Sequence, residues 1–212
     1  IENAVTLTEL DDIYRPYKKK RKTRASVAKE KGLEPLADII YEQSPDCKEP
    51  IVLAEEFINA ELGVETAEDA LQGAMDIIAE KISDDADVRK RMRFVCAAHG
   101  ILNVKGAKED LDVYEMYKEY SESVAKIADH RVLAINRGEK EECLKVTLAK
   151  DEEAFVQEIK NQMVKNQSEA GEIVANACQD AFNRLIFPSI EREVRGELTD
   201  KASEQAIKMF EV

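Results

Sequence analysis

The sequence predicts a mainly α-helical protein, a multi-helix module that carries one β-hairpin insert at about residues 131–149. Its 212 residues include only 8 glycines and 5 prolines, and 35% of them are charged. Proteins average about 7% glycine and about 5% proline, so turn-forming residues are scarce here. A β-sandwich, a barrel or a glycine-rich nucleotide-binding fold would need more of them, so these classes are excluded.

Short helices are expected at the start of the chain. A helix over residues 8–13 ends at Pro16, because proline disfavours helical geometry at the residue before it. The segment 16–22 is too charged to be buried and is expected to be extended. Thr23 then caps a further short helix, which Gly32 ends.

Three longer helices are expected in the middle of the chain, where apolar residues recur at three- and four-residue spacing. Thr66 caps the first, over residues 67–82. Ser83 begins the second, and Gly100 ends it. The third covers about residues 107–120. Its predicted inward face consists of Leu111, Tyr114 and Tyr117.

The β signal lies between residues 131 and 149. Residues 131–136 and 143–148 are rich in strand-forming side chains, and the second run alternates strictly between apolar and polar residues. Their linker contains Gly138, which suits a longer hairpin loop. A two-stranded ribbon is not stable alone in water, so this hairpin is expected to lie against helices.

Helical spacing returns after residue 150. Ser168 opens a helix, Pro188 breaks or kinks it, and Thr199 caps the last helix. The chain is therefore predicted to have four segments. They are a basic strap with short helices (1–49), a helical bundle (50–130), the β-hairpin (131–149) and the C-terminal helices (150–212).

No motif of an enzyme, a metal site or a cofactor site is found in the sequence. Glycine-rich phosphate loops, the zinc-protease helix motif and the nucleophile-elbow motif are all missing. Cys96 and His99 form a single C-x-x-H pair, and a zinc site needs a second such pair. We therefore expect no catalytic residue, no metal and no cofactor. The four cysteines are expected to be reduced thiols, mostly buried.

Positive charge is concentrated between Arg15 and Lys31. This segment, the basic strap, has nine basic residues and one acid, which leaves −21 for the rest of a chain whose net charge is −13. Its cations are interleaved with two tyrosines, as in surfaces that hold phosphates and stack on bases. The candidate nucleic-acid-binding residues are Tyr14, Tyr17, Lys18, Lys19, Lys20, Arg21, Lys22 and Arg24. The alternative is that the strap pairs with the molecule's own acidic helices.

Four ordered stretches of sequence resemble the bacterial Tex family of RNA-binding transcriptional accessory proteins. The first combines Tyr14–Tyr17, the basic run, Thr23–Ala25 and Lys31–Ala37. The others are Gly73–Glu80, His130–Glu139, and Arg184–Ile186 with Pro188–Arg195. With their flanks, these stretches cover more than half of the chain.

The sequence departs from the family pattern at two places. Lys19 stands where the family commonly has proline, and Ala128-Asp129 stands where Pro-Ser commonly precedes the His130-Arg131 pair. The first change loosens an extended strap but adds charge. The second makes the entry to the expected first strand less rigid.

The resemblance implies a fragment, the N-terminal helical region of a longer protein. Residues 150–212 would lead toward a missing ribonuclease-H-like domain, and helix-hairpin-helix and OB-fold domains would follow. Family members bind nucleic acid during transcription, without established catalysis. RNA or single-stranded nucleic acid is thus the implied partner, mostly through domains that this chain lacks.

Two functions are therefore expected as candidates. The first is a non-enzymatic helical scaffold of a nucleic-acid-binding transcriptional accessory protein, with the strap as a local contact. The second is a protein-interaction module that docks through acidic helices on RNA polymerase or another basic partner. We also expect a cytoplasmic location, because no secretory leader and no apolar run long enough to span a membrane is recognisable. Weak self-association of the fragment through its terminal helices is a further expectation.

Overall fold

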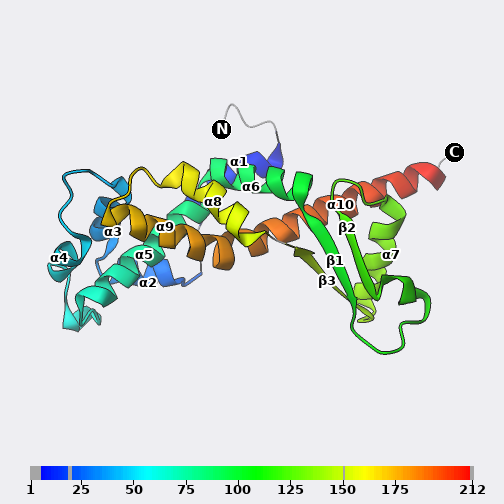
Figure 1. Ribbon diagram of the computed structural model, residues 1–212, viewed down its shortest axis with the longest axis horizontal. Helices are drawn as coiled ribbons and strands as arrows, with labels where there is room; N and C mark the ends of the chain where they lie inside the picture. Colours follow the sequence, from blue (N-terminus) through cyan, green and yellow to red (C-terminus); the bar gives the residue numbers. More distant parts are fainter. Residues whose placement is uncertain (1–5, 19–20, 150, 211–212) are drawn as a thin grey trace. The chain divides into compact units, whose positions relative to one another are not determined.

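The computed structural model describes residues 6–18, 21–149 and 151–210, and these fold into two compact units (Figure 1). Unit 1 consists of Ile1–Lys90 and Glu153–Phe187, and unit 2 of Arg91–Glu152 and Pro188–Val212. Helices dominate, with one small antiparallel sheet, so the predicted fold class is confirmed. The division into four segments stays a prediction.

In the part of unit 1 that the structure describes, the regular elements are helices, beside an isolated antiparallel β-bridge between Asn59 and Val64. In chain order they are α1 (Leu7–Tyr14), η1 (Arg15–Tyr17), α2 (Arg24–Glu30), α3 (Glu34–Glu42), α4 (Pro50–Glu55), η2 (Ala60–Leu62), α5 (Ala67–Ser83), the start of α6 (Ala86–His99), α8 (Glu152–Met163), α9 (Glu169–Ala181) and the π-helical turn η4 (Phe182–Ile186).

Helix α5 is the centre of unit 1, where it packs against α2, α3, α4 and α9 (Figure 1). Its start is fixed as predicted by a capping box, in which Thr66 and Asp69 each accept a hydrogen bond from the other's backbone N–H. Gly73 then lets α2 approach closely. A Cβ at this position would lie 2.4 Å from Leu33 Cδ1 and 3.3 Å from the Cβ of Ala28. The glycine is therefore needed for close packing rather than for a turn.

Two of the remaining predicted helix starts are confirmed and two are wrong. Ser83 is the last residue of α5, and α6 begins at Ala86, where the Asp85 carboxylate accepts the backbone N–H of Val88 at 2.9 Å. Thr23 caps α2 and Ser168 caps α9, each by accepting a backbone N–H at the start of its helix. Thr199 caps nothing, because it lies inside α10 (Phe187–Phe210), where its hydroxyl donates to the Arg195 carbonyl at 2.8 Å. Pro188 does not end a helix either. The π-helical turn just before it accommodates the proline, whose ring nitrogen cannot donate a backbone hydrogen bond.

Unit 2 combines the end of α6 with a three-stranded sheet and two helices. Its further elements are β1 (Ile101–Gly106), η3 (Asp112–Tyr117), β2 (Glu119–Ser123), α7 (Asp129–Lys140), β3 (Leu144–Ala149) and α10. The strand order is β2-β1-β3 and both pairs are antiparallel, with Val104 opposite Tyr120 on one side and Val146 on the other. Leu102, Val104 and Val146 pack with Val132 and Ile135 of α7 in its core.

The first strand of the predicted hairpin is wrong. Residues 131–136 belong to helix α7, and the strand that pairs with β3 is β1. A short apolar run fits a strand and a buried helix equally well, so periodicity could not decide between them. The second predicted strand is confirmed as β3, whose strict alternation places Leu144, Val146 and Leu148 in the core.

The helix predicted over residues 107–120 is also wrong, although its inward face is right. Leu111, Tyr114 and Tyr117 are buried, but they lie on and beside the short 3-10 helix η3, between two strands. A spacing of three residues suits a 3-10 turn as well as an α-helix.

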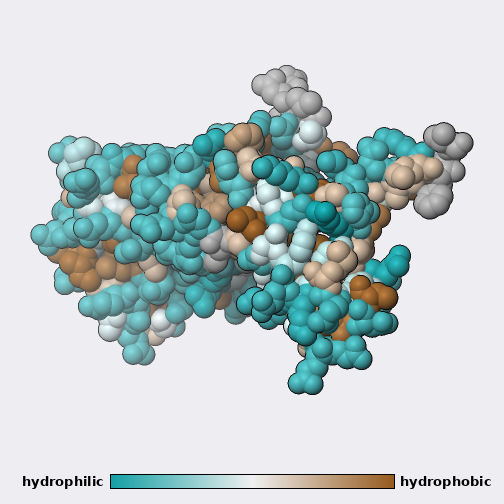
Figure 2. Space-filling model, turned by 45° about the vertical axis from the view of Figure 1, so that its right-hand side comes forward, coloured by the Kyte–Doolittle hydropathy of each residue, from teal (hydrophilic) through white to brown (hydrophobic). Residues whose placement is uncertain are grey.

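The face drawn in Figure 2 is mostly hydrophilic, with its hydrophobic side chains in small patches.

Two glycine substitutions test the close packing of α2 on α5. Gly73→Val should lower the free energy of unfolding by roughly 1–3 kcal/mol, because its branched side chain must displace Leu33 from a packed core. The matched control is Gly196→Ala in α10, where an added Cβ has no neighbour within 4 Å. It should stabilise by up to about 1 kcal/mol through helix propensity. Urea denaturation measures both, and a neutral Gly73→Val would contradict the packing role.

Candidate nucleic-acid interface

The basic strap starts from helix α1, which a buried ion pair fixes to unit 1. Arg89 Nε lies 2.8 Å from Asp12 Oδ1, and the side chains of Arg89 and Asp12 are 0% and 7% exposed. Removing one partner of an ion pair this deeply buried lowers the stability of a protein much more than removing one partner of a surface pair. The position of α1, and of the strap that follows it, therefore depends on this contact.

Two exposed tyrosines lie where α1 continues into η1. Tyr14 is 53% exposed and Tyr17 is 77% exposed. Their ring centroids are 6.4 Å apart and the ring planes are inclined by 33°. Neither ring is buried, so each exposes aromatic surface of the kind on which a base can stack.

Several cations of the strap are paired with carboxylates of unit 1. Arg15 Nε lies 3.2 Å from Asp84 Oδ1, Lys18 Nζ lies 2.8 Å from Asp11 Oδ1, and Lys29 bonds to Glu34. The hydrogen bond from Lys18 and its charge hold the pKa of the Asp11 carboxyl below its usual value. Part of the strap's charge is thus neutralised within the unit, as the alternative hypothesis predicts.

Three other cations of the strap lack an ion pair of this kind: Arg21, Lys22 and Arg24. All three are exposed, and none has a carboxylate within 4 Å among the residues with described positions. Arg24 is the first residue of α2, whose start is held by reciprocal hydrogen bonds between Thr23 and Ser26. Lys19 and Lys20 lie outside the described residues, so their part in the site stays a prediction.

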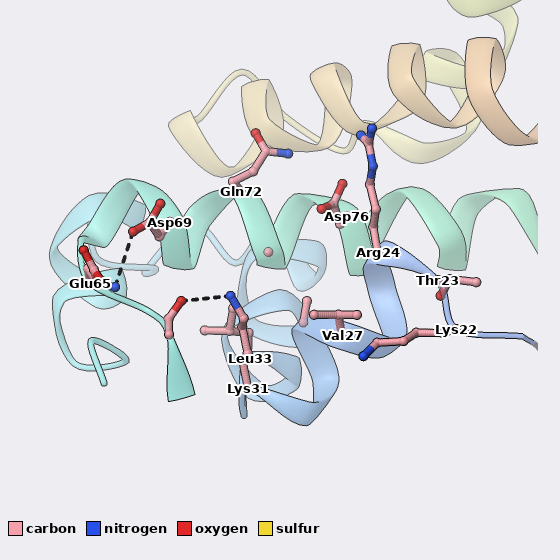
Figure 3. A pocket seen from close by; sticks show the side chains of 13 residues that line it. Lys22, Thr23, Arg24, Val27, Lys31, Leu33, Glu65, Asp69, Gln72 and Asp76 are labelled. Carbon is pink, nitrogen blue, oxygen red and sulfur yellow. Dashed lines mark hydrogen bonds between the residues drawn. The ribbon is translucent and has the colours of Figure 1, made fainter. Parts of the chain in front are cut away.

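Figure 3 shows the hollow of about 500 Å³ into which the end of the strap faces. Lys22 and Arg24 lie on its α2 side, and Arg24 extends beside Asp76 of α5. Lys31 donates to the Gly63 carbonyl at 2.8 Å, while the Asp69 carboxylate accepts the backbone N–H of Glu65. The hollow therefore has cations on one wall and carboxylates on the other.

Asp76 is the most deeply placed carboxylate of this hollow. Burial raises the pKa of its carboxyl, and the nearby guanidinium groups of Arg184 and Arg24 oppose that rise. Arg184 Nη2 lies 3.7 Å from Asp76 Oδ1. Sequence reasoning did not select Asp76 as a site residue, although it lies within Gly73–Glu80, one of the stretches that resemble the Tex family.

A second hollow, of about 580 Å³, lies on the other side of the strap. Arg21 and Lys18 line it together with acidic residues of α3 and α5 and the turn after α5. Lys81 lies 4.5 Å from the centre of the Tyr41 ring and bonds to Asp38. Both hollows are therefore lined by side chains of both charges.

The remaining sequence candidates do not assemble into a site. Burial raises the pKa of the Cys96 thiol to about 11 and that of Cys178 to about 12, whereas His99 is exposed. Within the described ranges, no three His, Cys, Asp or Glu side chains are placed to hold a metal ion. No described helix is both long enough and apolar enough to cross a membrane.

The described structure is mainly helical, and its sequence has one segment in which cations are concentrated. A family model described as "Tex central region-like" matches residues 46–210. The chain belongs to the Tex family, and the resemblance seen in four stretches is confirmed.

Named relatives match nearly the whole chain. The uncharacterized protein YdcI of Bacillus subtilis is 47% identical over 99% of this chain and 30% of its own length. Transcriptional accessory protein Tex of Neisseria gonorrhoeae is 29% identical over 99% of the chain and 28% of its own length. S1 RNA-binding domain-containing protein 1 of Homo sapiens is 30% identical over 98% of the chain and 22% of its own length. The chain thus spans less than a third of each of these relatives.

Two neighbouring aspartates test how the strap is anchored. Asp12→Ala should destabilise the protein by about 3 kcal/mol or more, because it leaves the buried charge of Arg89 without this carboxylate. Asp11→Ala is the matched control. It removes an exposed surface pair with Lys18 and should leave the urea midpoint nearly unchanged. Equal effects of the two substitutions would contradict the anchoring role of Asp12.

Proposed function

We propose that this chain is the non-enzymatic helical scaffold of a nucleic-acid-binding transcriptional accessory protein, with the basic strap as its local contact to single-stranded RNA. One relative is named as a transcriptional accessory protein and another as an RNA-binding-domain protein, which supports this context. The observation that carries the proposal is a set of three exposed cations that form no ion pair within 4 Å with a carboxylate of the described residues: Arg21, Lys22 and Arg24.

The proposed contact uses the two kinds of side chain separately. Arg21, Lys22 and Arg24 neutralise phosphates, while Tyr14 and Tyr17 offer exposed rings to unstacked bases. Lys19 and Lys20 join the cationic group by their place in the sequence. Contacts to phosphate position a chain without reading its bases, so the binding is independent of sequence.

The surroundings of the strap keep this binding weak. Outside the strap the chain carries −21, and carboxylates line both neighbouring hollows. A phosphate backbone that leaves the strap therefore meets negative charge on either side. Stronger binding by the full-length protein would come from domains that this chain does not include.

The second candidate function is docking on a basic protein partner such as RNA polymerase. This second function is favoured by the ion pairs of Arg15, Lys18 and Lys29 with carboxylates of unit 1. Cations that are paired within the unit are less available to phosphates. A cytoplasmic location belongs to both candidates. Weak self-association through the terminal helices would use less apolar surface than expected. Ile186 and Phe187 are buried, and Ile207 and Met209 are exposed.

Replacing Arg21, Lys22 and Arg24 together with alanine tests the RNA contact. If all three touch phosphates, the slope of log affinity against log salt for a single-stranded RNA should fall in magnitude by about 0.7 × 3, roughly 2. Fluorescence anisotropy at several salt concentrations measures affinity and slope together. Stability should change little, because these side chains are exposed.

The matched control removes three exposed lysines of unit 2, Lys105, Lys140 and Lys201, for the same change in net charge. It should lower affinity only slightly, without the loss of slope. No detectable binding of the wild type at about 50 mM salt, where phosphate contacts are strong, would overturn the proposal in favour of protein docking.

A further inference from the structure

The loop between β1 and β2 of unit 2 holds its shape through hydrogen bonds at both ends. Gly106 N–H donates to the Lys118 carbonyl and Ala107 N–H to the Cys143 carbonyl, both at 2.8 Å. Lys108 Nζ donates to the Glu141 carbonyl at 3.1 Å, and the Tyr114 hydroxyl to the Glu141 carboxylate at 3.0 Å. The segment is therefore an ordered projection (the green loop that joins β1 to β2 in Figure 1).

The 3-10 helix η3 sorts the side chains of this loop into three rows. A 3-10 helix has three residues per turn, so residues three apart lie one above the other. Leu111, Tyr114 and Tyr117 form the buried row. Val113 and Met116 form a second row, the apolar ridge, and they are 71% and 69% exposed. The third row consists of the exposed carboxylates of Asp112 and Glu115.

The backbone is held in an unfavourable conformation where η3 begins. Asp112 has a φ of +47°, in the left-handed region that residues other than glycine seldom adopt. Its N–H donates to the Asp110 carboxylate at 3.2 Å, which fixes this turn. The turn is what carries the chain from the buried Leu111 to the exposed Val113.

We propose that the apolar ridge is a docking site for a basic amphipathic helix of a partner protein. On η3 a rise of about 2.0 Å per residue separates Val113 from Met116 by about 6 Å along the axis. Four residues of an α-helix span the same ~6 Å at 1.5 Å per residue. Apolar side chains four residues apart on a partner helix therefore match the ridge.

The acidic residues beside the apolar ridge also favour a basic partner helix. Asp112 and Glu115 flank the ridge at the same spacing, and Glu109 and Asp110 add two more exposed carboxylates. Lys118 Nζ lies 3.1 Å from Glu115 Oε1 and neutralises part of this charge, but residues 108–118 keep a net charge of −2. Lysine or arginine residues bordering the apolar stripe of a partner helix would face these acids. The same carboxylates repel the phosphates of RNA. They also disfavour a second copy of this acidic chain, whose net charge is −13.

A labelled leucine–lysine peptide tests the proposal on the whole chain. It is about 18 residues long, enough to form a helix, with leucines at three- and four-residue spacing and lysines beside them. We expect it to bind, with Val113→Ser/Met116→Ser weakening binding about tenfold or more. Asp112→Asn/Glu115→Gln, which keeps a residue suited to the left-handed turn, should weaken binding several-fold and reduce its dependence on salt.

Two controls separate specific docking from general adhesion. Ile207→Ser/Met209→Ser removes a similarly exposed apolar pair from α10 and should leave affinity unchanged. A peptide of the same composition with its leucines scrambled should bind much more weakly. Equal loss with both serine pairs, equal binding of the scrambled peptide, or no binding at all would overturn the proposal. So would self-association of the free chain that Val113→Ser/Met116→Ser abolishes, seen by sedimentation.

The outcome is independent of the proposed RNA contact. Val113 and Met116 belong to unit 2 and the strap to unit 1. The ridge variant should therefore keep the RNA affinity of the wild type, and the Arg21, Lys22 and Arg24 variant should keep the peptide affinity. Unchanged melting temperatures would show that the exposed substitutions leave the fold intact.

Discussion

The close approach of α2 to α5 at Gly73 is the constraint on which the rest of unit 1 depends. Only a residue without a Cβ lets Leu33 and Ala28 pack directly on the α5 backbone. Because α2 forms the last part of the strap, this contact also fixes where the strap ends. The Asp12–Arg89 ion pair sets where it begins, so the strap runs between two points fixed by packing and by buried charge.

Fixing both ends of a charged segment has an electrostatic consequence. Cations near the fixed α1 end meet carboxylates of the same unit, and Arg15 and Lys18 pair with Asp84 and Asp11. Between the α1 end and α2, Arg21 and Lys22 have no such partner within the described structure. A single basic run thus has two parts: one part is paired with carboxylates of unit 1, and the other is exposed without such a partner among the described residues.

Local signals in the sequence predicted the helices of unit 1 better than the sheet of unit 2. Caps such as Thr23 and Thr66 act through their own neighbours, and they were found where expected. Strand pairing depends on distant residues. The choice of β1 as the partner of β3 left residues 131–136 to form a helix. The run Leu111–Tyr117 kept its buried face because three-residue spacing serves both kinds of helix.

The candidate site was predicted only at the level of its segment. Composition identified the strap, yet the partners of Lys18 and Arg15 depend on how α1 and α5 pack, which no local pattern encodes. The same holds for Asp76, whose environment comes from three helices. The apolar ridge shows the converse. In the sequence, Val113 and Met116 look like ordinary residues of a helix. In the structure they follow the left-handed turn at Asp112 and are exposed to solvent. Exposure that results from backbone geometry rather than from hydropathy can be recognised only once the backbone is known.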